Sequence, residues 1–146
     1  GVNKKVHHAI DLGITPVVGV GETLEQTNAG ATLATIETQL SIGLADLSQE
    51  EKPRLVIAYE PVWAIGTGVN ATPEQVIEIH KFIRKYLVER LGFSEEVGVR
   101  ILYGGSVNSE NSEQLLREKE IDGALVGGAS LNLESFCAII NSAIEI

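Results

Sequence analysis

Short apolar runs alternate with amphipathic stretches along the whole chain, and this alternation constrains the fold more than any other feature. The four apolar runs are short enough for buried strands and cover residues 16–20, 55–59, 99–103 and 124–126. Apolar strands separated by helices form parallel sheets that the helices cover. No linker or low-complexity tract interrupts the pattern, so we predict one α/β domain over residues 1–146.

Helices are predicted between these runs. Helical spacing and stop residues place them at residues 2–12, 22–47, from 72 onward, 110–117 and 133–143. The second has a candidate break near Gly30 and an end near Gly43. The third has the strongest start, because Thr72 can cap it, Pro73 takes its first position and Gln75 its third. Its core-facing stripe consists of Val76, Ile79, Ile83 and Leu87.

The last helix is expected to bury one apolar stripe. We predict that this stripe consists of Phe136, Ile140 and either Ala143 or Ile144. Cys137 lies in the same apolar helix, where it is expected to fill space in the core.

Two parallel-sheet folds fit this pattern, the open doubly wound sheet and the closed eight-stranded barrel. The distinctive segments 60–68, 104–107 and 127–131 all follow predicted strands. In the barrel, function lies in the loops that leave the carboxyl ends of the strands, often with phosphate held after the seventh and eighth. An open sheet also binds ligands at its carboxyl ends, so this placement favours the barrel without deciding the choice.

Glu60 is the leading candidate for chemistry. It ends an apolar strand and is followed at once by Pro61 and a glycine-bracketed loop. A solvated acid at a strand end is the ordinary alternative. That alternative does not explain Trp63 and Ile65, because solvation alone would not place large apolar groups in a loop. A carboxylate under a loop that can close over it is suited to act as a base in a dry pocket.

The segment from Ala58 to Gly68, AYEPVWAIGTG, closely resembles the active-site segment of the triosephosphate isomerase family. The resemblance covers essentially all 146 residues and implies a closed (β/α)8 barrel. The four predicted strands match the fifth to eighth of that family. Since a complete barrel takes ~250 residues, the chain resembles the C-terminal part of such an enzyme, about the C-terminal half of the barrel.

The resemblance implies a role for each part of the site. Glu60 would be the catalytic base that interconverts dihydroxyacetone phosphate and D-glyceraldehyde 3-phosphate through an enediolate, in glycolysis and gluconeogenesis. Tyr103 and Ser106 would hold the closed lid, and Leu125 would pack below Glu60. The lid and its hinge would be formed by Pro61, Val62, Trp63, Ala64, Ile65, Gly66, Thr67 and Gly68. The phosphate-binding residues would be Gly66, Ser106, Gly127 and Gly128.

Other candidate motifs are weaker. Ser106 does not stand in a G-x-S-x-G arrangement, so it is not expected to be a nucleophile. Gly19-Val20-Gly21 lacks the third glycine of a dinucleotide-binding loop, and Glu22 is interpreted as a structural acid. The histidines lack metal-ligand spacing, and ordinary helix-surface roles are predicted for His7, His8 and His80. No metal or organic cofactor is expected.

Composition excludes some partners. A net charge of −9 argues against nucleic-acid binding, and no run approaches the ~18 apolar residues of a membrane span. Backbone amides can still hold a small phosphorylated triose. A single cysteine fits a reducing compartment, so a cytoplasmic location is expected. The resemblance implies a homodimer for the complete enzyme.

Two departures from the family affect the expectation. Gly19 stands where many members have a cysteine. The family's catalytic lysine and histidine belong to earlier strands that this sequence does not contain. Because the chain also has no methionine and opens at Gly1, we expect a truncated chain that is inactive alone. The alternative is a half barrel that binds phosphorylated ligands without catalysis and self-associates.

Overall fold

The computed structural model of the chain describes residues 1–67 and 69–144, so the predicted lid residue Gly68 lies outside the described residues. Four parallel strands form one sheet, β1 (Val17–Val20), β2 (Val56–Tyr59), β3 (Ile101–Tyr103) and β4 (Gly123–Ala124). Their order in the sheet is their order in the chain. A doubly wound sheet reverses its strand order at a switch point, whereas successive units of a barrel do not. The predicted α/β class is confirmed.

The register of the sheet brings the carboxyl ends of the strands to one level. Val20 pairs with Tyr59, Tyr59 with Tyr103, and Tyr103 with Ala124. The segments that follow the strands therefore leave the sheet at the same edge. The fourth strand is displaced from its predicted position at 124–126. The edge itself is where the sequence placed the candidate site.

The helices occur in the predicted order. Helix α1 (Val2–Asp11) precedes β1. Helices α2 (Leu24–Asn28) and α3 (Thr32–Gly43) connect β1 to β2, and α4 (Pro73–Glu89) connects β2 to β3. Helix α5 (Ser112–Leu116) connects β3 to β4, and α6 (Leu133–Ile144) follows β4. The break near Gly30 is confirmed, because Gly30 adopts a φ of +68° between α2 and α3. The predicted start of α4 is also confirmed. Thr72 and Gln75 form a reciprocal capping box there.

The two faces of the sheet differ in character. Side chains alternate along each strand, and one face is buried against the helices by Val18, Val20, Ile57, Tyr59, Ile101 and Tyr103. On the opposite face, Val17 is 50% exposed and its neighbours Gly19 and Ala58 are small. Glu60 follows Ala58 by two residues on this second face. The candidate base therefore lies on the face opposite the one that packs against the helices.

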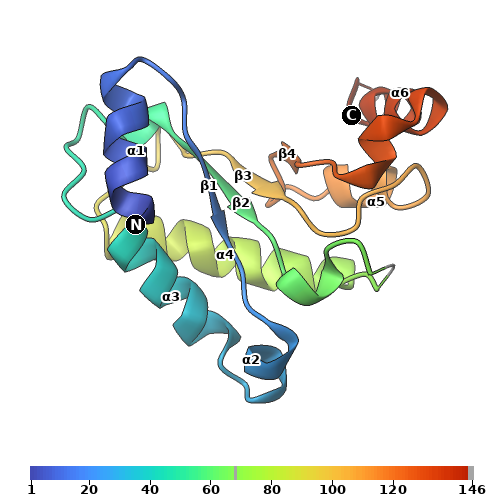
Figure 1. Cartoon of the computed structure of the whole chain (residues 1–146), viewed down its shortest axis with the longest axis horizontal. Coiled ribbons are helices and arrows are strands. Elements are labelled where there is room, and N and C mark those ends of the chain that lie inside the picture. The colour runs from blue at the N-terminus through green and yellow to red at the C-terminus, as the bar shows by residue number, and fades with distance from the viewer. Residues whose placement is uncertain (68, 145–146) are drawn as a thin grey trace.

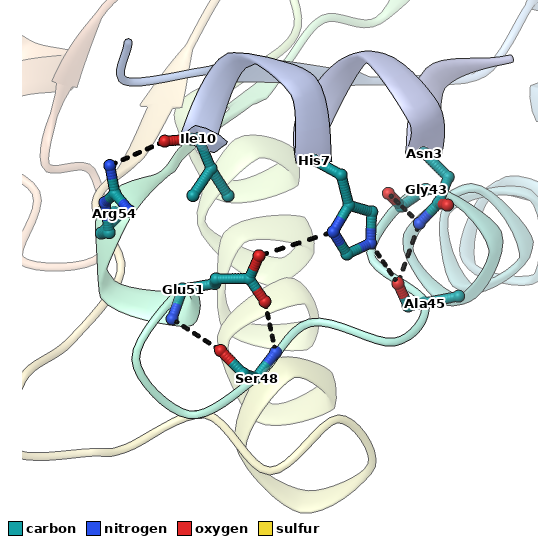
Figure 2. Close-up of polar contacts among 8 residues, drawn as sticks. All are labelled: Asn3, His7, Ile10, Gly43, Ala45, Ser48, Glu51 and Arg54. Carbon is teal, nitrogen blue, oxygen red and sulfur yellow. Dashed lines mark hydrogen bonds and ion pairs between the residues drawn. The ribbon is translucent and has the colours of Figure 1, made fainter. Parts of the chain in front are cut away.

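Polar contacts attach α1 to the loop that follows α3 (Figure 2). The Asn3 amide donates to the carbonyl oxygen of Ala45 at 2.9 Å, and the His7 ring nitrogen Nε2 lies 3.1 Å from the same oxygen. The other His7 ring nitrogen lies 3.5 Å from a carboxylate oxygen of Glu51. Arg54 donates to a carbonyl near the end of α1 at 2.8 Å. His7 thus has a structural role on a helix surface.

The prediction for α6 is wrong. Its buried apolar side chain is Ile139, which is 4% exposed. The exposed set comprises Phe136, Ile140, Ala143, Ile144 and Cys137. The reason is that α6 packs on α5, where the hydroxyls of Ser112 and Ser142 lie 3.0 Å apart, instead of covering the sheet (Figure 1).

The prediction for His80 is also wrong. This side chain is completely buried in α4, with its ring edge-on to Tyr59 at a centroid distance of 5.9 Å. Its Nδ1 lies 3.0 Å from the carbonyl oxygen of Glu120 and donates to it in the neutral tautomer. Burial lowers the pKa of His80 to about 4, so the ring is neutral at pH 7.

The buried His80 predicts a loss of stability in acid. Its folded-state pKa lies below its unfolded value, so the unfolded chain binds one more proton between about pH 6.5 and 4. The free energy of unfolding should fall by at most about 3 kcal/mol as pH falls through this window. Urea unfolding of wild type and His80→Phe at a series of pH values measures this change. The free energy of unfolding of His80→Phe should lose this dependence on pH. The exposed His8→Phe is the matched control, and an unchanged slope in His80→Phe would contradict the assignment.

Candidate active site

Glu60 is held at the carboxyl end of β2 by its backbone. Its N–H donates to the carbonyl oxygen of Val20 at 2.7 Å. The N–H of Gly104, which directly follows β3, donates to the carbonyl oxygen of Tyr59 at 2.8 Å. The Glu60 side chain is partly exposed, and burial raises the pKa of its carboxyl above the ordinary value. The strand thus delivers a carboxylate with increased basicity to the shared edge.

The segment after Glu60 forms a short 3-10 helix, η2 (Val62–Ala64), and then a turn. The Val62 N–H donates to the carbonyl oxygen of Glu22 at 2.9 Å, and the Ser106 hydroxyl donates to the carbonyl oxygen of Ala64 at 2.6 Å. Gly66 adopts a φ of +65°, which favours glycine. The predicted lid is therefore joined to the loops after β1 and β3.

Glu22 anchors the start of this lid. Its carboxylate is 1% exposed, and one oxygen, Oε1, accepts from Tyr59, Trp63 and Thr27. The bond from the Trp63 indole N–H is 3.0 Å long. Side chains from β2, the lid and α2 thus donate hydrogen bonds to one buried carboxylate. The interpretation of Glu22 as a structural acid agrees with this position.

The lid side chains divide into two groups. Pro61 and Ala64 are buried and Trp63 is partly buried, whereas Val62 and Ile65 are 50% and 47% exposed. The Thr67 hydroxyl donates to the carbonyl oxygen of Trp63 at 2.9 Å, which closes the turn. The buried group fixes the lid to the protein, and the exposed group leaves apolar surface beside the site.

The loop after β3 is organised by an asparagine pair that sequence reasoning missed. Asn111 donates to the carbonyl oxygen of Ser106 at 2.8 Å, and its own side-chain oxygen accepts from the Asn108 N–H at 2.9 Å. The available signal was the spacing of two asparagines just after a glycine pair, since asparagine side chains often bond nearby backbone groups. This bonding fixes the position of Ser106.

Tyr103 lies beneath the same loop. Its ring packs so closely on Gly105 that a side chain there would collide with the hydroxyl. The hydroxyl is buried and faces the backbone of Ala71 at the far end of the lid, and it makes no hydrogen bond of ordinary geometry to the described residues. The hydrogen bond from Tyr103 to the closed lid stays a prediction.

The loop after β4 presents backbone amides. Ser130 donates to the carbonyl oxygen of Gly127 through both its N–H, at 2.9 Å, and its hydroxyl, at 2.7 Å. Gly128 begins the 3-10 helix η3 (Gly128–Leu131), and nothing lies within 4 Å of the side-chain position of either glycine. Among the described residues, no acceptor receives the N–H of Gly66, Ser106 or Gly127.

A cavity of about 460 Å³ connects the three loops. It brings together seven predicted residues, Glu60, Ile65, Gly66, Ser106, Leu125, Gly127 and Gly128. Leu125 is 37% exposed. Asn70 and Asn108 line it as well and were not predicted. A carboxylate and several free N–H groups around one cavity can bind an anion and accept a proton from it.

Neither a metal cluster nor a membrane span is found in residues 1–67 and 69–144. No group of three metal-ligating side chains in this part of the chain could hold an ion. No helix in it is both long and apolar enough to cross a membrane.

The fold and the site define an α/β protein built from consecutive parallel βα units, with a cavity at the carboxyl ends of its strands. The family model for triosephosphate isomerase matches residues 1–143. The chain therefore belongs to the triosephosphate isomerase family, and its sheet is half of a (β/α)8 barrel.

Curated relatives support this assignment. Triosephosphate isomerase of Chloroherpeton thalassium is 51% identical over 142 residues, which cover 97% of this chain and 56% of the relative. That of Protochlamydia amoebophila is 51% identical over 142 residues, covering 96% and 53%. That of Carboxydothermus hydrogenoformans is 50% identical over 143 residues, covering 98% and 57%. The chain thus spans little more than half the length of the relatives it matches.

We predict that the hydrogen bond of the Ser106 hydroxyl limits the motion of the lid. Ser106→Ala removes the donor to the Ala64 carbonyl but leaves the backbone N–H in place. Since a hydrogen bond contributes about 1 kcal/mol, amide hydrogen exchange in residues 62–67 should become about fivefold faster. The control is Ser41→Ala, which removes a similar hydroxyl-to-carbonyl bond within α3. Unchanged exchange in the lid would show that this contact does not hold it.

Proposed function

We propose that this chain supplies the base and the phosphate site of a triosephosphate isomerase. The single observation that carries the proposal is the cavity in which Glu60 and the free N–H groups of three loops meet. The reaction interconverts dihydroxyacetone phosphate and D-glyceraldehyde 3-phosphate. The family membership supports this substrate, because the matched relatives bear that enzyme's name.

Glu60 acts as the base. Its carboxylate removes a proton from the carbon beside the substrate carbonyl, which leaves an enediolate, and returns the proton to the neighbouring carbon. The carbonyl and hydroxyl oxygens exchange one proton in the same process, so no atom is gained or lost. Burial raises the pKa of Glu60, and this increases the affinity of the carboxylate for the carbon-bound proton.

Backbone amides hold the phosphate. The described residues that line the cavity include no lysine or arginine, whereas Gly66, Ser106, Gly127 and Gly128 converge on it from three loops. Successive N–H groups form concave sites for anions without a charged side chain. This explains how a chain with a net charge of −9 can bind a phosphorylated triose.

The lid protects the intermediate. Ile65 lines the cavity and is 47% exposed, and this apolar surface would be buried when the lid closes over a bound substrate. Excluding water matters here because an enediolate phosphate exposed to water can eliminate its phosphate. Pro61, Trp63, Ala64 and Thr67 hold the segment, with Leu125 on the opposite wall.

The remaining groups for catalysis belong to the other part of a barrel. A base and a phosphate site do not stabilise the charge on the enediolate oxygens, and such stabilisation usually contributes most to the rate. We propose that this chain alone is inactive. A complete enzyme would close the barrel across the outer edges of β1 and β4, would form the expected homodimer and would operate in cytoplasmic glycolysis. No metal or organic cofactor is required for this proton transfer.

Glu60→Asp tests the role of the base. A fusion of this chain to the N-terminal half of the Chloroherpeton relative supplies a full-length barrel for the assay. The shorter side chain retracts the carboxylate by about 1 Å, so kcat should fall ~100-fold or more while KM changes little. Glu25→Asp, at an exposed position on α2, is the matched control. Near-normal kcat in the Glu60 variant would remove this residue from the mechanism.

The 146-residue chain, without the N-terminal half of the barrel, tests the alternative of a half barrel that binds phosphorylated ligands without catalysis. Its turnover and its affinity for glycerol 3-phosphate are measured on a preparation of confirmed intact mass. We expect no turnover. A stable dimer by gel filtration that binds glycerol 3-phosphate would favour the self-associating module, and turnover above buffer would contradict the proposed division of catalytic groups.

A further inference from the structure

Gly19 lies beside the candidate base although it is distant in sequence. It is paired with Ala58 in the register of β1 and β2. Both residues lie on the face of the sheet that also carries Glu60, two positions beyond Ala58. The Glu60 carboxylate extends to Gly19 on β1, where its Oε2 is the nearest atom to the side-chain position.

The space for this arrangement exists only because position 19 has no side chain. A Cβ atom on Gly19 would lie 2.6 Å from the carboxylate oxygen Oε2 of Glu60 and 3.8 Å from its Cδ. On the other side, a Cβ atom on Gly104 would lie 2.6 Å from Glu60 Cγ and 3.3 Å from Oε1. The carboxylate therefore occupies a slot between glycines on the two strands that flank β2.

The backbone does not require glycine at position 19. Gly19 lies within a regular strand and has no left-handed φ, unlike Gly30 and Gly66. A glycine inside a strand weakens it, because it gains no packing and loses more chain entropy on folding. The glycine therefore has a cost in strand stability, and the Glu60 carboxylate is what occupies the space that it leaves.

We propose that Gly19 is a positioning residue that sets where the Glu60 carboxylate rests. The cavity with the phosphate loops lies on the β3 and β4 side of Glu60, whereas Gly19 lies on the β1 side. The missing side chain lets one carboxylate oxygen of Glu60, Oε2, rest on the β1 side, beside Gly19. A side chain at position 19 would displace this oxygen toward β3 and the loops that hold phosphate. This inference deepens the proposed function, because it concerns the same base.

A double-mutant cycle on the 146-residue chain tests the contact. With Glu60 present, Gly19→Ala should lower the urea midpoint, because the methyl group collides with the carboxylate. In the Glu60→Asp background the shorter side chain no longer reaches position 19, and Gly19→Ala should raise the midpoint as an ordinary glycine replacement in a strand does. The reversal of sign is the expected result. Equal shifts in both backgrounds would overturn the proposal.

Gly43→Ala is the matched control for this cycle. Its new methyl group would meet Val2 at an ordinary contact distance of 3.7 Å, far from the base, so its effect should be the same in both backgrounds. If Gly19→Ala alone fails to fold, folding of the double variant Gly19→Ala/Glu60→Asp supports the contact. Failure of both variants to fold contradicts it.

A second readout responds to position and not to stability. The pKa of Glu60 is measured by NMR of its carboxyl carbon in wild type and Gly19→Ala. No other titratable side chain is among the described residues that line its cavity. Displacement away from Gly19 increases hydration of the carboxylate, so its pKa should fall toward the ordinary value. An unchanged pKa would contradict the displacement.

Turnover separates this inference from the proposed function. In the full-length fusion, Gly19→Ala should change kcat more than KM, because the phosphate loops are untouched, and Gly43→Ala should change neither. If the unsubstituted fusion has no activity, the proposed function fails, whereas the cycle and the pKa still decide whether Gly19 positions Glu60.

Discussion

The level pairing of the parallel strands is the constraint on which the rest of the structure depends. Val20, Tyr59 and Tyr103 are neighbours across three strands, so the loops after them begin side by side. A shift of one residue would turn Glu60 to the helix-covered face, since successive side chains point in opposite directions. The buried tyrosines, packed against α4, oppose such a shift. The position of the site thus depends first on the register of the strands and only then on the conformation of each loop.

Two buried polar side chains, Glu22 and His80, link other segments to the paired strands. Glu22 joins β2 to the start of the lid, and His80 joins α4 to the segment before β4. Each is satisfied in part by a partner distant in sequence, and an unpaired buried polar group is costly. Their role is therefore specific: they favour the one arrangement of helix, strand and lid in which their donors and acceptors meet.

The sequence predicted the strands, the capped helix and the cluster around Glu60, because local periodicity and strand-end position determine these features. It failed for Ile139 and His80, because the face that a helix buries depends on which neighbour it meets. Seven predicted residues line one cavity. The contact between Gly19 and Glu60 and the bond from Asn111 to Ser106 could not be predicted, since both depend on side-chain conformations between segments.

Because α6 packs on α5 and η3, the chain can be divided into two structural units, although Leu115 and Ile139 belong to the same apolar core as the strands. One contains α1 to α4 with β1 to β3. The other contains α5, η3 and α6, and it joins the sheet through the two-residue strand β4 (Figure 1). Segments with few contacts to the rest open at a lower free energy than the core. The loops that would hold phosphate are shared between these units, since Gly66 belongs to the first and Gly127 to the second. A bound anion would therefore contact both units. Because it would bind only when both are folded, occupancy of the site would be linked to the folding of the C-terminal unit.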